Sequence, residues 1–266
     1  MDNVTLGIIT YNALEITKKA FELHSKYTPK NTKFIILDND SSDKKVVEFL
    51  ETQEYLNIKL IPSEENHGFA KGHNIIQSMV DTEFYICMNP DVYVCEGWLE
   101  KMMNAWDRHK KDNIGILGCH QIDGKGDECH QGMGFIYRNY ENGTTLVEPI
   151  NLSKIQFPNG KPDDLEVQGV TFSCAMWNKD IMKNFPLSEK YVMGFYEDAD
   201  LCMRVREAGY TIFCDFLLTL VHYMHGSWGE KPKEMVELGE SNLRVWNSYW
   251  RNQVIDTKEW LSKRIL

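Results

Sequence analysis

Three short acidic segments stand where apolar runs of this sequence end. They are Asp38-Asn39-Asp40, Asn89-Pro90-Asp91 and Glu197-Asp198-Ala199-Asp200. Taken singly, acidic residues in such places are usually solvated turn formers. Brought together, they would offer the oxygen ligands that Mg²⁺ and Mn²⁺ prefer and a carboxylate able to act as a general base. The first question is therefore what brings them together.

Asp91 is the candidate metal ligand, because it follows an apolar run at a turn fixed by Pro90. His222, in LVHYMHGSW, is the candidate second ligand, with His225 as its competitor. An isolated histidine is more often a structural residue, so the two readings stay open. The ion expected from carboxylate and imidazole ligands is Mn²⁺ or Mg²⁺.

Asp198 is the candidate general base, with Glu197 beside it. Its place at the start of an expected helix is equally typical of a capping carboxylate, which the exposed amides and the helix dipole stabilise. Asp200 and Arg204 are four residues apart on the same helix, a spacing that favours a structural ion pair.

The segment NHGFAKGHN, residues 66–74, is a glycine-bearing loop that leads into a helix. Such a loop lets backbone amides approach a phosphate closely. It lacks the spacing of the Gly-x-Gly-x-x-Gly and Walker motifs. A plain connection between strand and helix explains it equally well.

Alternating strands and helices position these segments. Apolar runs predict strands at 4–10, 33–38, 58–62, 84–89 and 113–118, and helical periodicity predicts helices at 13–27, 43–52, 72–79 and 97–110. This alternation predicts an α/β fold with a doubly wound, mainly parallel sheet, in which ligands gather at the carboxyl ends of the strands.

The pattern changes after Gly118. Hairpin-like strands are expected at 134–138 and 145–149, a strand at 166–177, helices at 179–185 and 198–208, and a strand at 210–216. Gly209 is the expected stop of the second helix. A C-terminal helix carries one face of Met235, Leu238, Asn242, Val245, Trp246 and Tyr249. We expect one domain over residues 1–229, with halves 1–118 and 119–229, followed by a helical appendage over 230–266.

Composition excludes some partners and compartments. Twenty-nine basic against thirty-nine acidic residues leave a net charge of −10, which argues against nucleic acid. No apolar run approaches the roughly 20 residues that span a bilayer, and no signal peptide is evident at the start, so a cytoplasmic protein is expected. The seven cysteines favour buried thiols over disulfides. The Cys119-His120 and Cys129-His130 pairs match no familiar zinc spacing.

Six motifs, in order, resemble the inverting nucleotide-sugar glycosyltransferases of family 2, which have the GT-A fold. They are ITYN (9–12), LDNDSSD (37–43), N-x-GFA-x-G-x-N (66–74), MNPD (88–91), GFYEDADLCMR (194–204) and VHYMHGS (221–227). The resemblance covers roughly residues 4 to 228. The NPD and YEDADLC forms are most similar to the rhamnosyltransferase-like branch, which builds bacterial polysaccharides.

The resemblance implies roles for individual residues. The nucleotide pocket would be lined by Thr10, Tyr11, Asn12 and Asp38, and its floor would be shaped by Asn66, Gly72 and Asn74. Asn89 would stand at the first position of the family's Asp-x-Asp motif, and the metal would be bound by Asp91 and His222. Asp198 would be the base, and Glu197 would orient the acceptor. The fold implied is a Rossmann-like nucleotide-binding half joined to an acceptor-binding half.

The implied reaction moves a hexose, rhamnose among the options, from a UDP- or dTDP-linked donor to a glycan or lipid-linked acceptor. Two alternatives stay open. A sugar nucleotidyltransferase would need a glycine-rich loop with Arg and Lys after the first strand, which ITYNALEITKK lacks. A non-catalytic nucleotide-sugar-binding protein would have no need of both Asp91 and Asp198.

The C-terminal segment has three interpretations. Its aromatic residues Trp246, Tyr249, Trp250 and Trp260 stand beside Lys and Arg. The simplest interpretation is a helix packed on the domain. Peripheral contact with the inner face of a membrane and a homodimer contact are left open.

Overall fold

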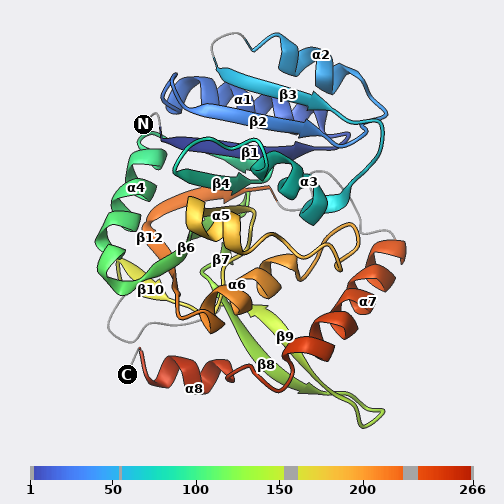
Figure 1. Ribbon diagram of the computed structural model, residues 1–266, viewed down its shortest axis with the longest axis vertical. Coiled ribbons are helices and arrows are strands. Elements are labelled where there is room, and N and C mark those ends of the chain that lie inside the picture. Colours follow the sequence, from blue (N-terminus) through green and yellow to red (C-terminus); the bar gives the residue numbers. More distant parts are fainter. Residues whose placement is uncertain (1–2, 54–55, 153–160, 224–232, 265–266) are drawn as a thin grey trace.

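The computed structural model describes residues 3–53, 56–152, 161–223 and 233–264. One ten-stranded sheet runs through the molecule in the order β10-β12-β6-β11-β4-β1-β2-β3, with β5 beside β12 and β7 beside β6. Helices cover both faces of this sheet, and a separate two-stranded hairpin projects beside the C-terminal helices (Figure 1). The expected doubly wound, mainly parallel α/β architecture is confirmed.

The first half alternates strands and helices. Its elements are β1 (Val4–Thr10), α1 (Leu14–Tyr27), β2 (Lys33–Asp38), α2 (Lys45–Glu51), β3 (Asn57–Pro62), α3 (Gly68–Gln77) and β4 (Phe84–Met88). These four strands are mutually parallel, and the register sets Thr10 beside Asp38 and Asp38 beside Pro62. The carboxyl ends of the strands therefore meet at one edge. β1, β2 and β4 are almost wholly buried, as expected of parallel strands covered on both faces.

The part of the chain after β4 builds the rest of the sheet. It contains β5 (Val92–Tyr93), α4 (Trp98–Arg108), a 3₁₀ turn (Lys110–Asp112), β6 (Ile114–Ile122), β7 (Glu128–His130), β8 (Met133–Asn139), β9 (Thr145–Asn151), β10 (Asp164–Glu166), β11 (Cys174–Asn178), α5 (Lys179–Asn184), α6 (Glu197–Glu207) and β12 (Thr211–His222). β11 is antiparallel to both β4 and β6, and β12 is parallel to β6. The β8–β9 hairpin confirms the two predicted hairpin strands.

Several predicted boundaries are wrong. The range 166–177, predicted as one strand, contains the last residue of β10, a loop and most of β11. Val170 and Phe172 in that loop are buried, so the apolar run reports burial and not a strand. The strand predicted at 210–216 continues to His222, and the helix predicted from residue 72 begins at Gly68.

The C-terminal segment packs on the domain through α7 (Lys233–Trp250) and α8 (Thr257–Ser262). Its buried face consists of Asn242, Leu243, Trp246, Asn247 and Trp250. Tyr249, predicted on that face, is instead exposed. The predicted division after residue 229 lies outside the described residues.

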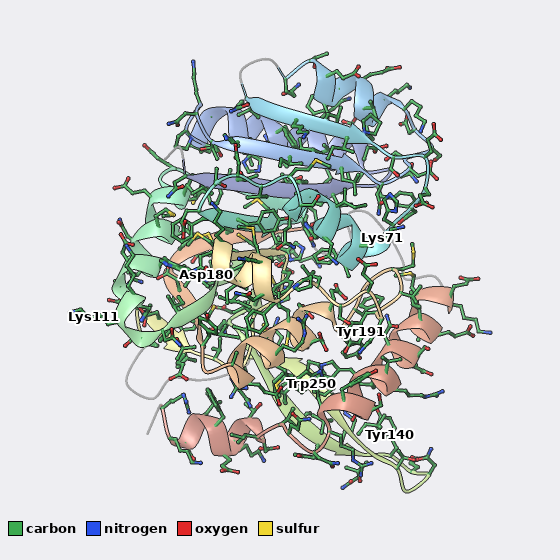
Figure 2. The ribbon with its side chains drawn as sticks, viewed as in Figure 1. Lys71, Lys111, Tyr140, Asp180, Tyr191 and Trp250 are labelled. Carbon is green, nitrogen blue, oxygen red and sulfur yellow. The ribbon has the colours of Figure 1, made fainter. Side chains whose placement is uncertain are left out.

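The side chains of α7 reach several parts of the second half. Asn247 exchanges hydrogen bonds with the backbone of Val147 on β9, at 2.7 and 2.9 Å. In Figure 2, Tyr191 and Trp250 both lie between α6 and α7, and both donate to Asp200. The packed helix, the simplest of the three interpretations, is therefore observed.

Among the described residues, no helix combines the length and apolarity needed to cross a membrane. All seven cysteines are described, and each is a free thiol. Six of them are buried and Cys95 is half-buried, which agrees with the interpretation from composition.

Candidate active site

A cavity of about 340 Å³ opens at the edge where the carboxyl ends of the strands meet. Both halves of the chain contribute to its lining. Of the residues singled out from the sequence, it is lined by Tyr11, Asn66, Asn89, Asp91, Glu197, Asp198 and His222. The three acidic segments, distant in sequence, thus lie around or directly behind one cavity.

Asp91 and His222 meet at the bottom of this arrangement. β5 pairs with β12 so that Val92 lies opposite His222, and the amide of Tyr223 donates to the Asp91 carbonyl at 2.9 Å. His222 Nε2 consequently lies 3.2 Å from Asp91 Oδ1. Both side chains are buried. His225, the competing histidine, falls outside the described residues.

The chemistry of this pair fits a divalent cation. Within the described part of the chain, His222 Nδ1 has no hydrogen-bond partner, and Asp91 Oδ1 makes the 3.2 Å contact with His222 Nε2 but no hydrogen bond. Buried polar atoms normally have partners, so an oxygen and a nitrogen ligand are left available at the cavity. A carboxylate with an imidazole suits Mn²⁺ and tolerates Mg²⁺. Asn89 lines the same cavity but offers a neutral amide in place of a second carboxylate.

Glu197 and Asp198 are the first two residues of α6. The chain enters the helix through Tyr196, whose φ of 74° is left-handed and whose side chain makes no capping bond. Asp198 Oδ1 accepts the amide of Ala199 at 2.7 Å. Tyr196 occupies the N-cap position, and Asp198 lies in the first turn of α6, where an exposed amide still donates to it. The stabilising role at the helix start and the role as a base both stay open.

The two carboxyl groups have unlike proton affinities. Burial raises the pKa of Asp198 to about 6, while backbone hydrogen bonds from Ala199 and Phe172 oppose the rise. Burial and the adjacent Asp198 charge raise the pKa of Glu197 to about 8. The pair therefore keeps a proton to a higher pH than two free carboxyl groups would, with Glu197 the stronger proton holder. Glu197 Oε2 is buried without a partner among the described residues, which leaves it available to a ligand.

Asp200 has a structural role. Its Oδ2 accepts Arg204 Nε at 2.7 Å, which confirms the predicted ion pair. Its Oδ1 accepts Tyr191 Oη at 3.1 Å and Trp250 Nε1 at 2.9 Å. This carboxylate therefore ties α6 to α7 and faces away from the cavity lining.

Thr10, Asn12 and Asp38 lie behind the cavity and do not line it. Asp38 is fully buried and accepts Ser41 Oγ at 2.5 Å and Thr10 Oγ1 at 3.3 Å. Asn12 Oδ1 accepts the amide of Ser42 at 2.7 Å. These bonds fix the loop that follows β2. Direct contact of the three residues with a nucleotide stays a prediction.

Asn39 also lines the cavity. The sequence analysis gave it no role, although it lies within the motif LDNDSSD. Asn39 donates to Asn66 Oδ1 at 2.8 Å and accepts the amide of His67 at 2.8 Å. Asn66 in turn accepts the amide of Gly68 at 2.9 Å. The two asparagines join the loops after β2 and β3 into one wall of the cavity.

Gly72 and Asn74 support this wall from below. A Cβ on Gly72 would lie 2.6 Å from Ile9 Cδ1, so its absence lets α3 pack closely on β1. Asn74 bonds both the carbonyl and the amide of Leu187, each at 2.9 Å. Neither residue lines the cavity, which accords with a place in the floor and leaves their predicted role untested.

Apolar side chains complete the lining, and the sequence analysis missed them. They are Phe69, Phe172, Met193, Phe195 and Met235. Phe172 stands in a segment predicted as a strand, and Met235 in a helix whose position the sequence left open. Only their tertiary placement brings them together.

A family model described as Glycosyl transferase family 2 matches residues 5–185, more than half of the chain. The chain belongs to glycosyltransferase family 2. The match includes all predicted site residues from Thr10 to Asp91. It ends before Glu197, Asp198 and His222. Among curated protein sequences, no match is found.

Solved structures confirm the GT-A fold. The mannosyltransferase PcManGT from Pyrobaculum calidifontis, in complex with GDP-Man and Mn²⁺, aligns with TM-score 0.63 and 12% identity over 96% of this chain and 66% of its own. GalNAc-T7 with UDP, GalNAc and Mn²⁺ aligns with TM-score 0.65 and 13% identity over 94% of this chain and 49% of its own. S. aureus TarS 1-349 with UDP-GlcNAc aligns with TM-score 0.57 and 14% identity, over 88% and 64%.

The chain thus spans between half and two thirds of the length of these proteins. At such low identity the likeness concerns the fold alone. The membership of the rhamnosyltransferase-like branch stays a prediction.

Proposed function

We propose that this family 2 chain is a metal-dependent inverting glycosyltransferase. The observation that supports this most strongly is that Asp198 and the Asp91–His222 pair line the same cavity. A base and a cation site facing one cavity suit the transfer of a sugar away from a diphosphate. A protein that only binds a nucleotide sugar would gain nothing from the raised pKa of Asp198.

The reaction is a single in-line displacement. An acceptor hydroxyl attacks the anomeric carbon, the new carbon–oxygen bond forms as the bond to the diphosphate breaks, and the nucleoside diphosphate leaves with the bonding electrons. Asp198 takes the hydroxyl proton, a role worth on the order of 10² to 10⁴ in rate. Glu197, protonated, donates a hydrogen bond that orients the acceptor.

Asp91 and His222 would hold the divalent ion, Mn²⁺ or Mg²⁺, in the same cavity. When bound, the ion neutralises the charge that grows on the leaving diphosphate. Tyr11, Asn39 and Asn66 also line the cavity and are proposed to contact the nucleotide. The net charge of −10 makes such a cation useful for holding an anionic donor.

The donor is proposed to be a UDP- or dTDP-linked hexose, with rhamnose as the transferred sugar suggested by the NPD and YEDADLC motifs. The similar structures carry GDP-Man, UDP with GalNAc, and UDP-GlcNAc, so a nucleotide sugar is the class of donor to test. The acceptor is proposed to be a glycan or a lipid-linked glycan in polysaccharide synthesis.

Calorimetry of nucleoside diphosphates and their sugars, with and without Mn²⁺, tests donor binding. We expect one nucleotide to bind only with the metal, and Asp91→Asn to weaken that binding. If no nucleoside diphosphate binds under any condition, the proposed function is wrong.

Asp198→Asn tests the base. Transfer should fall by about 10² or more, while Mn²⁺-dependent nucleotide binding persists, because the amide keeps the shape but cannot take the proton. Glu207→Gln, an exposed change on the same helix, is the matched control and should transfer normally. Near wild-type turnover in Asp198→Asn would refute the assignment.

A further inference from the structure

Cys129, His130 and His222 gather beside the candidate active site. One ligand atom from each, a sulfur and two ring nitrogens, lies within 4.8 Å of the other two. Cys129 and His130 are on β7, and His222 ends β12. Both strands pair with the last residues of β6, so the topology itself brings the three side chains to one place.

Local irregularity turns these side chains toward one another. The pairing of β7 with β6 shifts register between Gln121 and Ile122, and such bulges re-aim side chains at the ends of strands. The rings of His130 and His222 stack at 5.5 Å between centroids. The consecutive residues Cys129 and His130 can therefore both reach His222.

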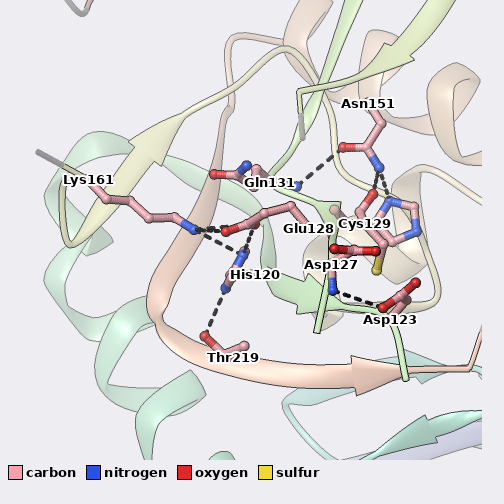
Figure 3. Close-up of polar contacts among 10 residues, drawn as sticks. His120, Asp123, Asp127, Glu128, Cys129, Gln131, Asn151, Lys161 and Thr219 are labelled. Atoms are coloured by element: carbon pink, nitrogen blue, oxygen red, sulfur yellow. Dashed lines mark hydrogen bonds and ion pairs between the residues drawn. The ribbon is translucent and has the colours of Figure 1, made fainter. Parts of the chain in front are cut away.

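Polar contacts hold β7 on both sides, as Figure 3 shows. Glu128 contacts His120 and Lys161, the latter at 3.2 Å. Asn151 contacts the Cys129 carbonyl and His130 Nδ1. The Asn151 amide is the donor, so His130 Nδ1 accepts here, and a cation bound at this nitrogen would replace that hydrogen bond.

The chemistry of the cluster differs from that of the Asp91 site. Cys129 and His222 are buried, and His222 Nδ1 has no partner among the described residues. His130 offers a ring nitrogen beside the Cys129 sulfur and the His222 ring. One thiolate with two imidazoles favours Zn²⁺ over Mg²⁺ or Mn²⁺.

The geometry requires only small movements. With metal distances of about 2.0–2.3 Å, ligand atoms of a tetrahedral site stand about 3.3–3.7 Å apart. Atoms that already lie within 4.8 Å of one another need to approach by about 1 Å to reach this spacing.

We propose that Cys129, His130 and His222 form a Zn²⁺ site with an open fourth position. Cys129 releases its thiol proton to solvent as the ion binds. Because His222 also faces Asp91, Zn²⁺ bound here opposes the binding of Mn²⁺ and inhibits transfer. This regulatory consequence rests on the function proposed above, whereas the binding of Zn²⁺ does not.

Cobalt titration of the full metal-free chain, without nucleotide, tests the site. Co²⁺ should give thiolate charge-transfer absorption and the visible bands of a tetrahedral ion, and Zn²⁺ should displace it. Cys129→Ser and His130→Gln should each weaken Zn²⁺ binding by more than about 100-fold, beyond the cost of losing an outer-sphere partner. Cys95→Ser, a half-buried thiol outside the cluster, is the control. Thiolate bands that persist in Cys129→Ser would overturn the proposal.

A second measurement separates this proposal from the proposed function. Asp91→Asn should keep the cobalt bands and lose Mn²⁺-dependent nucleotide binding, and Cys129→Ser should do the reverse. Low Zn²⁺ should inhibit transfer by the wild type and not by Cys129→Ser. If the wild type binds Co²⁺ as expected but binds no nucleotide, the Zn²⁺ site stands and the transferase proposal fails.

Discussion

At the scale of single residues, Glu197 and Asp198 keep a proton to a higher pH than two free carboxyl groups would. Their unlike pKa values, about 8 and about 6, arise because both are buried and Glu197 also feels the charge of Asp198. Two neighbouring carboxyl groups with separated pKa values are typical of an acid and a base working together. The pair therefore predicts a pH dependence of transfer.

We expect kcat/KM to rise as the pH passes about 6, because Asp198 must be ionised to accept a proton, and to fall above about 8, where Glu197 loses the proton it donates. Glu197→Gln keeps the hydrogen-bond donor but cannot ionise. The alkaline fall should disappear in this variant while the acid limb remains. An unchanged alkaline limb would exclude Glu197 as its source.

The contribution of Asp198 to the free energy of unfolding should decrease over the pH range in which transfer activity increases. The folded-state pKa of Asp198 is raised from 3.8 to about 6, so the folded state favours its protonated form. The contribution of protonated Asp198 to the free energy of unfolding is fully present below pH 3.8 and is lost as the pH rises through about 6. Asp198→Asn should therefore raise Tm at pH 7.5 but not near pH 4, as measured by calorimetry. An equal change at both pH values would contradict this explanation.

At the scale of elements, the start of α3 and the loop before α6 close the cavity together. The amide of Phe69 donates to the Met193 carbonyl at 2.9 Å. Gly68 has a φ of +68°, and a Cβ there would lie 2.8 Å from Met193 Cα. Glycine is thus required both for the turn and for the close approach of two backbones.

Gly68→Ala should destabilise the fold by more than about 1 kcal/mol and weaken nucleotide-sugar binding, because Gly68 and Met193 both line the cavity. Gly126→Ala is the matched control, since φ is +91° there but nothing lies within 4 Å of the added Cβ. Denaturant unfolding and calorimetry measure the two effects. Equal losses in both variants would show that backbone strain, and not the contact with Met193, is responsible.

The order and type of the elements in the first half follow directly from the sequence. The runs VTLGIIT and KFIILD are buried on both faces, so apolar periodicity alone marks them as strands. An apolar run does not predict a strand correctly in the loop at 167–173, because Val170 and Phe172 are buried there by packing and not in a strand. The predicted buried face of α7 is wrong for a related reason. Asn247 is polar but is buried, because it hydrogen-bonds to the backbone of Val147.

At the scale of the whole molecule, α7 completes the fold. Trp246 is fully buried in a cluster with Phe135 and Val147 of the β8–β9 hairpin. Trp250 donates to Asp200 on α6 at 2.9 Å. Met235 at the other end of the helix lines the cavity. The C-terminal segment therefore belongs to the catalytic domain's core and to its candidate site.

A chain ending at residue 232 should unfold at a lower temperature than the full chain, since it exposes the surfaces that Trp246 and Trp250 cover. Trp250→Phe should cost about 1–3 kcal/mol by leaving Asp200 with one fewer donor. Tyr249→Phe, at an exposed neighbour, should stay within about 0.5 kcal/mol. A truncated chain as stable as the full chain would show that the segment is an appendage.

The α/β class, the parallel strands of the first half and the acidic residues at the ends of those strands can be predicted from the sequence, because burial on two faces and turn chemistry are local properties. The sequence also marked Asp91, His222, Glu197 and Asp198. Three features follow only from the folded arrangement of the chain: β5 pairs with β12 and sets Asp91 against His222, Asp200 binds Trp250, and Cys129 lies close to His222. These contacts join residues from about 50 to 130 positions apart, and their distances depend on strand order and register, which no local pattern encodes.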